Sequence, residues 1–96
     1  MDKATAVTSV VSDLTKRGWA VFSPIADSII DLLSLGPSGQ VLKVAVVTGS
    51  MNENGDLSYR TPERSAPIRD LLAVVVDNGA SFYIDATGQK VNPMAV

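Results

Sequence analysis

The chain has 96 residues, with eight Lys and Arg against ten Asp and Glu, and it contains neither cysteine nor histidine. This length allows one domain, and a hydrophobic content of 46% is sufficient for a packed core. Disulfide frameworks, thiolate or imidazole metal sites and serine–histidine catalysis are therefore excluded, which leaves chemistry by carboxylate, lysine, serine or tyrosine.

Residues 3–17 are predicted to form an amphipathic helix. Its apolar stripe has the spacing of one helical face and comprises Ala4, Val7, Val10, Val11 and Leu14. Asp2 is the candidate N-cap, and Gly18 is the residue expected to end the helix. The helix needs packing against another layer, because valine has only modest helix propensity.

Five strands are predicted after this helix, over residues 19–23, 28–35, 40–48, 71–76 and 81–85. Turn sequences at 36–39 and 77–79 predict antiparallel hairpins. Residues 49–67 are expected to be a polar loop in which 57–60 could form a short strand. We therefore predict one α+β domain over residues 1–96, with the helix packed on a mixed, mainly antiparallel five-stranded sheet. The core is expected at 3–86 and a weakly packed, flexible tail at 87–96.

The net charge of −2 argues against extended nucleic-acid binding, which usually requires a basic excess. The basic residues are nevertheless clustered at Lys16–Arg17 and at Arg60, Arg64 and Arg69. Two interpretations stay open for the three arginines: contact with phosphates or an acidic partner, or a solvated loop.

No segment resembles a targeting signal or a membrane span. The longest apolar run, Leu71–Val76, is far shorter than the roughly 20 residues needed to cross a bilayer. We expect a cytoplasmic protein with no membrane segment.

The order of elements from Gly18 to Thr48 is informative. A helix ends in Gly-Trp, a strand follows, and an acid then lies within an apolar strand before a hairpin returns through Val-Ala-Val-Val-Thr. This order resembles the PD-(D/E)XK nuclease superfamily, particularly its small endonucleases related to Holliday-junction resolvases and some homing endonucleases. The later Asp70–Val76 and Ser81–Ile84 resemble the terminal hairpin of that branch. The resemblance covers roughly residues 3–86 and implies a restriction-endonuclease-like domain encoded by a phage or mobile element. If a phage encodes it, the expected location is the virion or the host cytoplasm.

In this superfamily two carboxylates hold a divalent metal, usually Mg²⁺, at the scissile phosphate, and a lysine assists. By resemblance the first acid is Asp31, the second acid falls on Ala45, and the lysine falls on Val47. The glutamate that some members carry on the helix falls near Val7. A single carboxylate provides too few anionic ligands for Mg²⁺. The resemblance therefore implies a degenerate active site, and no cofactor is expected.

A relocated site is the alternative. Asp27 would supply a second carboxylate, and Lys43 would supply the lysine, since it shares a strand face with Ala45 and Val47. Such a site would bind Mg²⁺ through Asp31 and Asp27. Otherwise Asp27 is a turn residue, Lys43 is a solvated strand residue, and Asp31 is an exposed acid or the partner of an arginine.

Nearly every residue from 42 to 47 is apolar, on both faces of the predicted strand, whereas one helix covers only one face. An apolar patch around Ala45 and Val47 is therefore expected, which favours a homo-oligomer or a protein partner. We expect a catalytically inactive nuclease-like protein that binds a protein or, despite its charge, DNA. A residual Mg²⁺-dependent DNA endonuclease or junction resolvase and a structural virion accessory protein are the alternatives. The candidate binding residues are Lys16, Arg17, Lys43, Arg60, Arg64 and Arg69.

Overall fold

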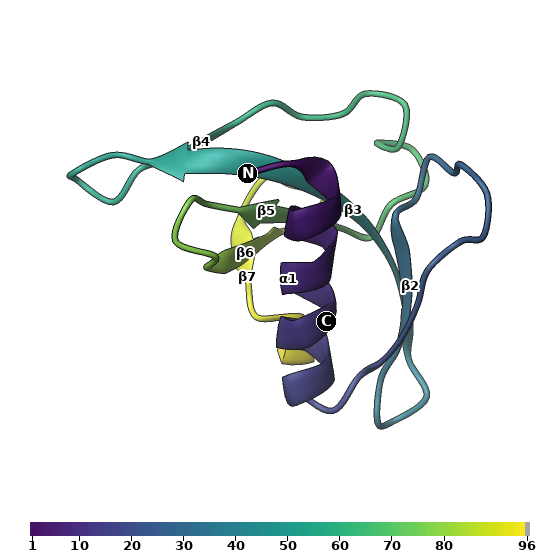
Figure 1. Cartoon of the computed structure of the whole chain (residues 1–96). Helices are drawn as coiled ribbons and strands as arrows, with labels where there is room; N and C mark the ends of the chain where they lie inside the picture. The colour runs from purple at the N-terminus through teal and green to yellow at the C-terminus, as the bar shows by residue number, and fades with distance from the viewer. Residues whose placement is uncertain (96) are drawn as a thin grey trace.

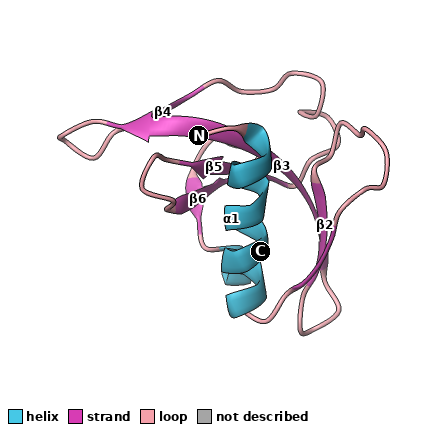
Figure 2. Ribbon diagram, viewed as in Figure 1, coloured by secondary structure: helices cyan, strands magenta, loops and turns pink. Residues whose placement is uncertain are grey.

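The computed structural model describes residues 1–95, in which one long helix lies across one face of a mixed sheet (Figures 1 and 2). The elements in chain order are α1 (Lys3–Lys16), β1 (Ala20–Phe22), β2 (Leu32–Leu35), β3 (Val41–Met51), β4 (Leu57–Tyr59), β5 (Leu71–Val75), β6 (Ser81–Ile84), β7 (Lys90–Val91) and a 3-10 turn, η1 (Pro93–Ala95). Within the described part of the chain, no helix has the length and hydrophobicity that crossing a membrane requires.

The sheet has the strand order β1-β2-β3-β5-β6-β7, and β4 pairs with the far end of β3 outside this path. β3 and β5 are parallel, with Val44 opposite Leu71, and the other pairs are antiparallel. The predicted class of one helix on a mixed, mainly antiparallel sheet is confirmed, although the sheet has seven strands rather than five.

The helix begins where the sequence predicts. The Asp2 carboxylate accepts the main-chain N–H of Thr5 at 2.8 Å, and this hydrogen bond lowers the pKa of Asp2. Gly18 follows the helix with a φ of 92°, a conformation that favours glycine. The fully buried helix residues are Ala6, Val10 and Leu14. The expectation that Ala4 extends the apolar face is wrong, because Ala4 is exposed and Ala6 takes the buried position.

The two additional strands come from segments expected to be loop and tail. β4 forms a hairpin with β3 that projects from the side of the molecule (Figure 1). β7 pairs with β6, Pro93 is fully buried, and the Trp19 indole N–H donates to the Met94 sulfur at 3.2 Å. The expected weak packing of residues 87–96 is therefore not what the described part of this segment shows. The sequence did not predict this packing for two reasons. A two-residue strand is too short to show the alternation of apolar and polar residues that indicates a strand. The packing of this segment also depends on Trp19, which is distant in sequence.

Two apolar clusters hold the sheet. The larger one lies between α1 and the sheet and includes Trp19, Leu32, Val44 and Val46. The second lies on the opposite face, where Ala45, Leu72, Val74 and Ile84 are buried and Val47, Leu57 and Tyr59 pack against them. Ala45 is only 2% exposed, so the expected open apolar patch does not include Ala45, whereas Val47 is half-buried. Around Ala45, side chains of β4, β5 and β6 pack on the face of β3 that α1 does not reach.

Candidate functional site

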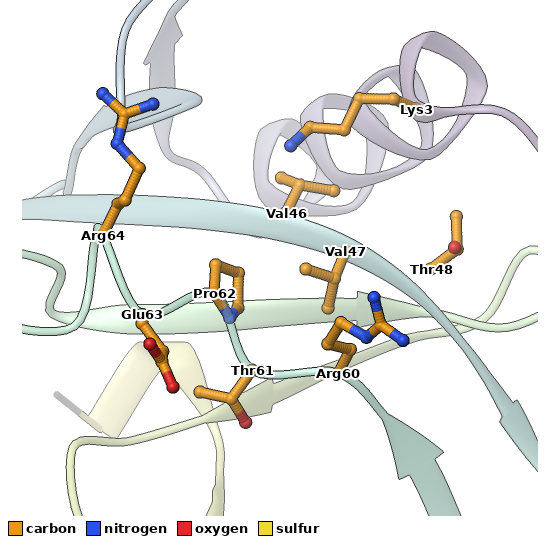
Figure 3. Close-up of a pocket in the computed structure, with 9 residues that line it drawn as sticks. All are labelled: Lys3, Val46, Val47, Thr48, Arg60, Thr61, Pro62, Glu63 and Arg64. Carbon is orange, nitrogen blue, oxygen red and sulfur yellow. The ribbon is translucent and has the colours of Figure 1, made fainter.

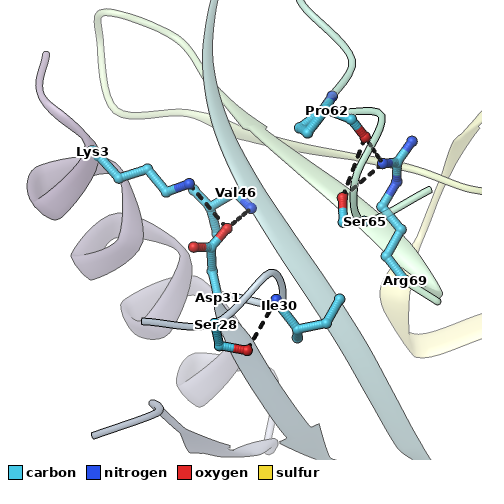
Figure 4. Close-up of polar contacts among 8 residues, drawn as sticks. All are labelled: Lys3, Ser28, Ile30, Asp31, Val46, Pro62, Ser65 and Arg69. Atoms are coloured by element: carbon cyan, nitrogen blue, oxygen red, sulfur yellow. Dashed lines mark hydrogen bonds and ion pairs between the residues drawn. The ribbon is translucent and has the colours of Figure 1, made fainter. Parts of the chain in front are cut away.

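Asp31 lies immediately before β2 and extends its pairing with β3. Its main-chain N–H donates to the Val44 carbonyl at 3.0 Å, and its carboxylate oxygen Oδ2 accepts the N–H of Val46 at 2.7 Å (Figure 4). Val46 is fully buried, so its N–H needs a protein partner. The regular pairing of β2 with β3 begins only at Leu32, so no main-chain carbonyl of β2 continues the ladder to Val46. The Asp31 side chain takes the place of that carbonyl and accepts the Val46 N–H.

The same carboxylate oxygen forms an ion pair with a residue that the sequence analysis missed. Lys3 Nζ, from the first turn of α1, lies 3.1 Å from Asp31 Oδ2 (Figure 4). Lys3 is one helical turn before Val7, where the family resemblance places a helical glutamate, and residues four apart share a helix face. That spacing is the signal by which Lys3 could have been identified. A cation therefore lies beside Asp31, on the helix face where the resemblance to nucleases places a glutamate.

The structure brings the three positions identified by resemblance close to Lys3. Asp31 and Ala45 line one hollow of about 190 Å³, and Val47 lines a neighbouring cleft of about 590 Å³. Lys3, Pro62 and Arg64 line both. The neighbourhood predicted for Asp31, Ala45 and Val47 is thus a continuous surface region, with Lys3 at its centre.

The larger cleft is basic although the chain is acidic. Its lining includes three cations, Lys3, Arg60 and Arg64, against the single carboxylate of Glu63. Figure 3 shows Lys3 reaching from the helix over Val46, with Arg60 beside Val47. Arg60 and Arg64 belong to the loop that follows β4, which forms one wall, while β3 forms the other. Guanidinium and ammonium groups around an apolar floor are well suited to an anion such as a phosphate.

Arg69 has a different environment from Arg60 and Arg64. Its Nη1 donates to the Pro62 carbonyl at 2.6 Å and to the Ser65 hydroxyl at 2.9 Å (Figure 4). Ser65 is buried and Arg69 is half-buried. Arg69 therefore ties together the loop that carries Arg64, and in this conformation its Nη1 is directed at the protein rather than at a ligand.

The residues of the alternative, relocated site lie apart from this cleft. Lys43 donates its main-chain N–H to Asp70 Oδ2 at 2.8 Å, and its Nζ lies 3.9 Å from the same oxygen. Its side chain lines another hollow, together with Phe22 and Leu33. Asp27 lies on the exposed segment between β1 and β2. The Lys43 ammonium is thus paired with Asp70, whereas the ammonium beside Asp31 is that of Lys3.

Lys16 and Arg17 lie at the opposite end of α1 from Lys3, about 20 Å away along the helix axis. Lys16 is exposed. The Arg17 Nε donates to Asp13 Oδ2 at 3.0 Å, and the guanidinium lies 5.7 Å from the centre of the Tyr83 ring. The Tyr83 hydroxyl donates to the same Asp13 oxygen, and burial together with this carboxylate raises the pKa of Tyr83. Arg17 thus belongs to contacts that fasten α1 to β6.

The residues at the nuclease positions do not fit a divalent metal. Of Asp31, Ala45 and Val47 only Asp31 offers side-chain oxygen ligands, and one of these oxygens already accepts from Val46 and pairs with Lys3. Among residues 1–95, no three or more Asp, Glu, His or Cys side chains are grouped so that they could hold a metal ion. Mg²⁺ requires near-octahedral oxygen coordination and is usually held by one or two carboxylates that are free to bind it.

The fold is similar to that of a bacterial homing endonuclease, I-Ssp6803I, with a TM-score of 0.69 and 20% sequence identity. The match covers 85% of this chain and 61% of the endonuclease, so this chain spans about three-fifths of that protein's length. The similarity shows a nuclease-like fold. No protein-family model matches the sequence, and no curated protein matches it either.

Proposed function

We propose that this protein is a catalytically inactive nuclease-fold domain that binds DNA through phosphate contacts in the basic cleft of Lys3, Arg60 and Arg64. The observation that carries the proposal is that Arg60 and Arg64 line the cleft against the single carboxylate of Glu63, while Lys3 Nζ is paired with Asp31 Oδ2 at 3.1 Å. This pairing offsets the Lys3 charge and engages the acid that the resemblance assigns to a metal ion, so the two arginines supply the excess positive charge. The cleft can therefore attract a phosphate without supplying metal-assisted hydrolysis.

The loss of cleavage follows from the side chains available. Ala45 and Val47 have neither a metal ligand nor a proton donor, and the chain has no histidine to act as a general base. A buried alanine cannot be replaced functionally by a nearby residue without moving β3, since Ala45 is 2% exposed within a packed cluster. Hydrolysis of a phosphodiester needs both charge neutralisation and an activated water, and the cleft supplies only the first.

Binding is supported by the contrast between the local and the overall charge. The chain has a net charge of −2, yet three cations and one carboxylate line the cleft. Arginine guanidinium groups bind phosphate oxygens through two parallel hydrogen bonds, whereas lysine acts as a point charge. Two or three phosphate contacts give weak, salt-dependent binding with little sequence preference.

The binding test is fluorescence anisotropy of labelled single- and double-stranded DNA. The double variant Arg60→Ala/Arg64→Ala is expected to lower the affinity by about ten-fold or more and to reduce the slope of log affinity against log salt by about 2. Lys16→Ala is the matched control, because it removes an exposed cation at the far end of α1. Equal binding by wild type and the double variant would contradict the proposal, as would a larger effect of Lys16→Ala.

The cleavage test uses junction, double-stranded and single-stranded DNA with Mg²⁺ or Mn²⁺. No cleavage is expected from the wild-type chain. Metal-dependent cleavage that disappears in Asp31→Ala would establish a residual endonuclease and overturn the inactive assignment. The two tests are independent, because DNA binding can be present whether or not the DNA is cut.

A further inference from the structure

The first three strands present an uncovered apolar face on the side away from α1. Phe22, Leu33, Leu35 and Val41 are 55%, 44%, 41% and 53% exposed, and we call these four residues the arm face. Phe22 is opposite Leu33 on β1 and β2, and Leu35 is opposite Val41 on β2 and β3. Because side chains alternate along a strand, their neighbours Ser34 and Leu42 are buried on the opposite, α1 side.

The surroundings of the arm face are also apolar, and the few charges are at its edge. A hollow of about 360 Å³ adjoins it, lined in part by Phe22, Leu33 and Pro24, and the next residue, Ile25, is fully exposed. Lys43 is opposite Leu33 on β3, and its ammonium lies 3.9 Å from Asp70. The rim therefore carries one cation and one anion, whereas the four residues at the centre carry none.

We propose that the arm face packs against the arm face of a second copy of this chain in a two-fold symmetric dimer. In a two-fold interface the same patch serves both copies, so the patch must be complementary to itself. An uncharged centre satisfies this condition, since no like charges are brought together. The rim satisfies it as well, because Lys43 and Asp70 are paired with each other within each copy and bring no net charge to the interface. A strongly charged partner would find no complementary charges at the centre of this face.

The exposed area predicts a weak dimer. The four residues together leave roughly 350 Å² of apolar surface open on each copy, whereas a standard interface takes about 800 Å² from each partner. Ala20, Ile25 and the aliphatic part of Lys43 lie around the arm face and could extend the buried area toward that value. We therefore expect a dissociation constant in about the micromolar to hundred-micromolar range.

The first experiment is sedimentation equilibrium of the full chain from about 10 µM to about 1 mM. The wild type is expected to dimerise in this range. Leu33→Lys and Phe22→Lys are expected to raise the dissociation constant by about ten-fold or more, because each substitution places a charge from both copies in the apolar interface. Both residues are exposed, and circular dichroism verifies that the variants fold. Met51→Lys is the matched control, since Met51 is 38% exposed at the far end of β3.

A chain that remains monomeric over the whole range would overturn the proposal and assign the arm face to a different macromolecule. A dimer that both lysine variants leave intact would overturn it by placing the interface elsewhere.

The dimer proposal does not rest on DNA binding, because Lys3, Arg60 and Arg64 are not part of the arm face. Leu33→Lys measured at concentrations where the chain is monomeric should not weaken DNA binding. The failure of one proposal is therefore distinguishable from the failure of the other.

Discussion

Replacement of Asp31 tests whether this residue now serves the fold rather than a metal. In Asp31→Ala, the N–H of the fully buried Val46 loses its acceptor at 2.7 Å, and Lys3 loses its ion-pair partner. An unsatisfied buried N–H costs about 2 kcal/mol. The ion pair adds little, about 0.5 kcal/mol or less, because the Lys3 side chain is 59% exposed. Asp31→Ala should therefore lower the free energy of unfolding by about 2 kcal/mol.

Two further variants separate these contributions. Asp31→Asn keeps a side-chain oxygen for the Val46 N–H but loses the charge, so its cost should be about 1 kcal/mol. Lys3→Ala should cost about 0.5 kcal/mol or less. Urea unfolding followed by circular dichroism gives the three values. For a chain of this length, the largest corresponds to a fall in Tm of roughly 10 °C.

A resident metal ion would give the opposite pattern. Mg²⁺ at millimolar concentration would then stabilise the wild type by mass action, and Asp31→Ala would abolish this stabilisation. We expect no dependence of Tm on Mg²⁺ for either protein. Our account of Asp31 is refuted if Asp31→Ala is as stable as the wild type, or if Mg²⁺ raises the wild-type Tm in an Asp31-dependent way.

Three other predictions concern the scaffold of the site. Gly49→Ala should destabilise by about 2 kcal/mol in urea unfolding, because the new Cβ would lie 2.7 Å from the main-chain oxygen of Ser58; unchanged stability would contradict this contact. Tyr83→Phe should cost about 2 kcal/mol in the same assay, since it removes the hydroxyl that donates to Asp13 Oδ2 at 2.5 Å, and a neutral result would assign that carboxylate to other partners. The lowered pKa of Asp2 stabilises the fold fully above pH 3.8, its ordinary value, and this contribution is lost as the pH falls through the lower folded value. Asp2→Asn should therefore weaken the pH dependence of stability below pH 3.8, and an identical acid limb in both proteins would count against the N-cap.

The helix and the hairpins could be predicted because their signals are local. The Asp2 cap and the valine spacing define α1 within one residue of its observed end. The turn at 36–39 joins β2 and β3 as expected. β4 and β7 could not be predicted in this way, since strands of three and two residues are too short to show an alternation of apolar and polar residues. Both exist because longer elements, β3 and β6, offer free edges with which they pair.

The candidate site was predicted in part. Resemblance to nucleases placed Asp31, Ala45 and Val47 in one neighbourhood, and the structure has Asp31 and Ala45 lining the same hollow. The contact between Lys3 and Asp31 joins residues 28 positions apart, and no local pattern specifies it. The covering of Ala45 was missed for a similar reason, because it depends on how the strands beside β3 and the side chains of β4 pack over it.

The sequence by itself determined which side-chain chemistry is available: a chain without histidine or cysteine has no imidazole base and no thiolate, and the resemblance to nucleases places Ala45 and Val47 where an acid and a lysine would stand. Side-chain identity is independent of conformation, so no fold of this chain can add an imidazole or a thiolate. The tertiary structure alone decided where the charges and apolar groups gather. It gathers Lys3, Arg60 and Arg64 around one cleft. It also leaves Phe22 and Leu33 of the arm face uncovered, because α1 can pack on only one face of the sheet.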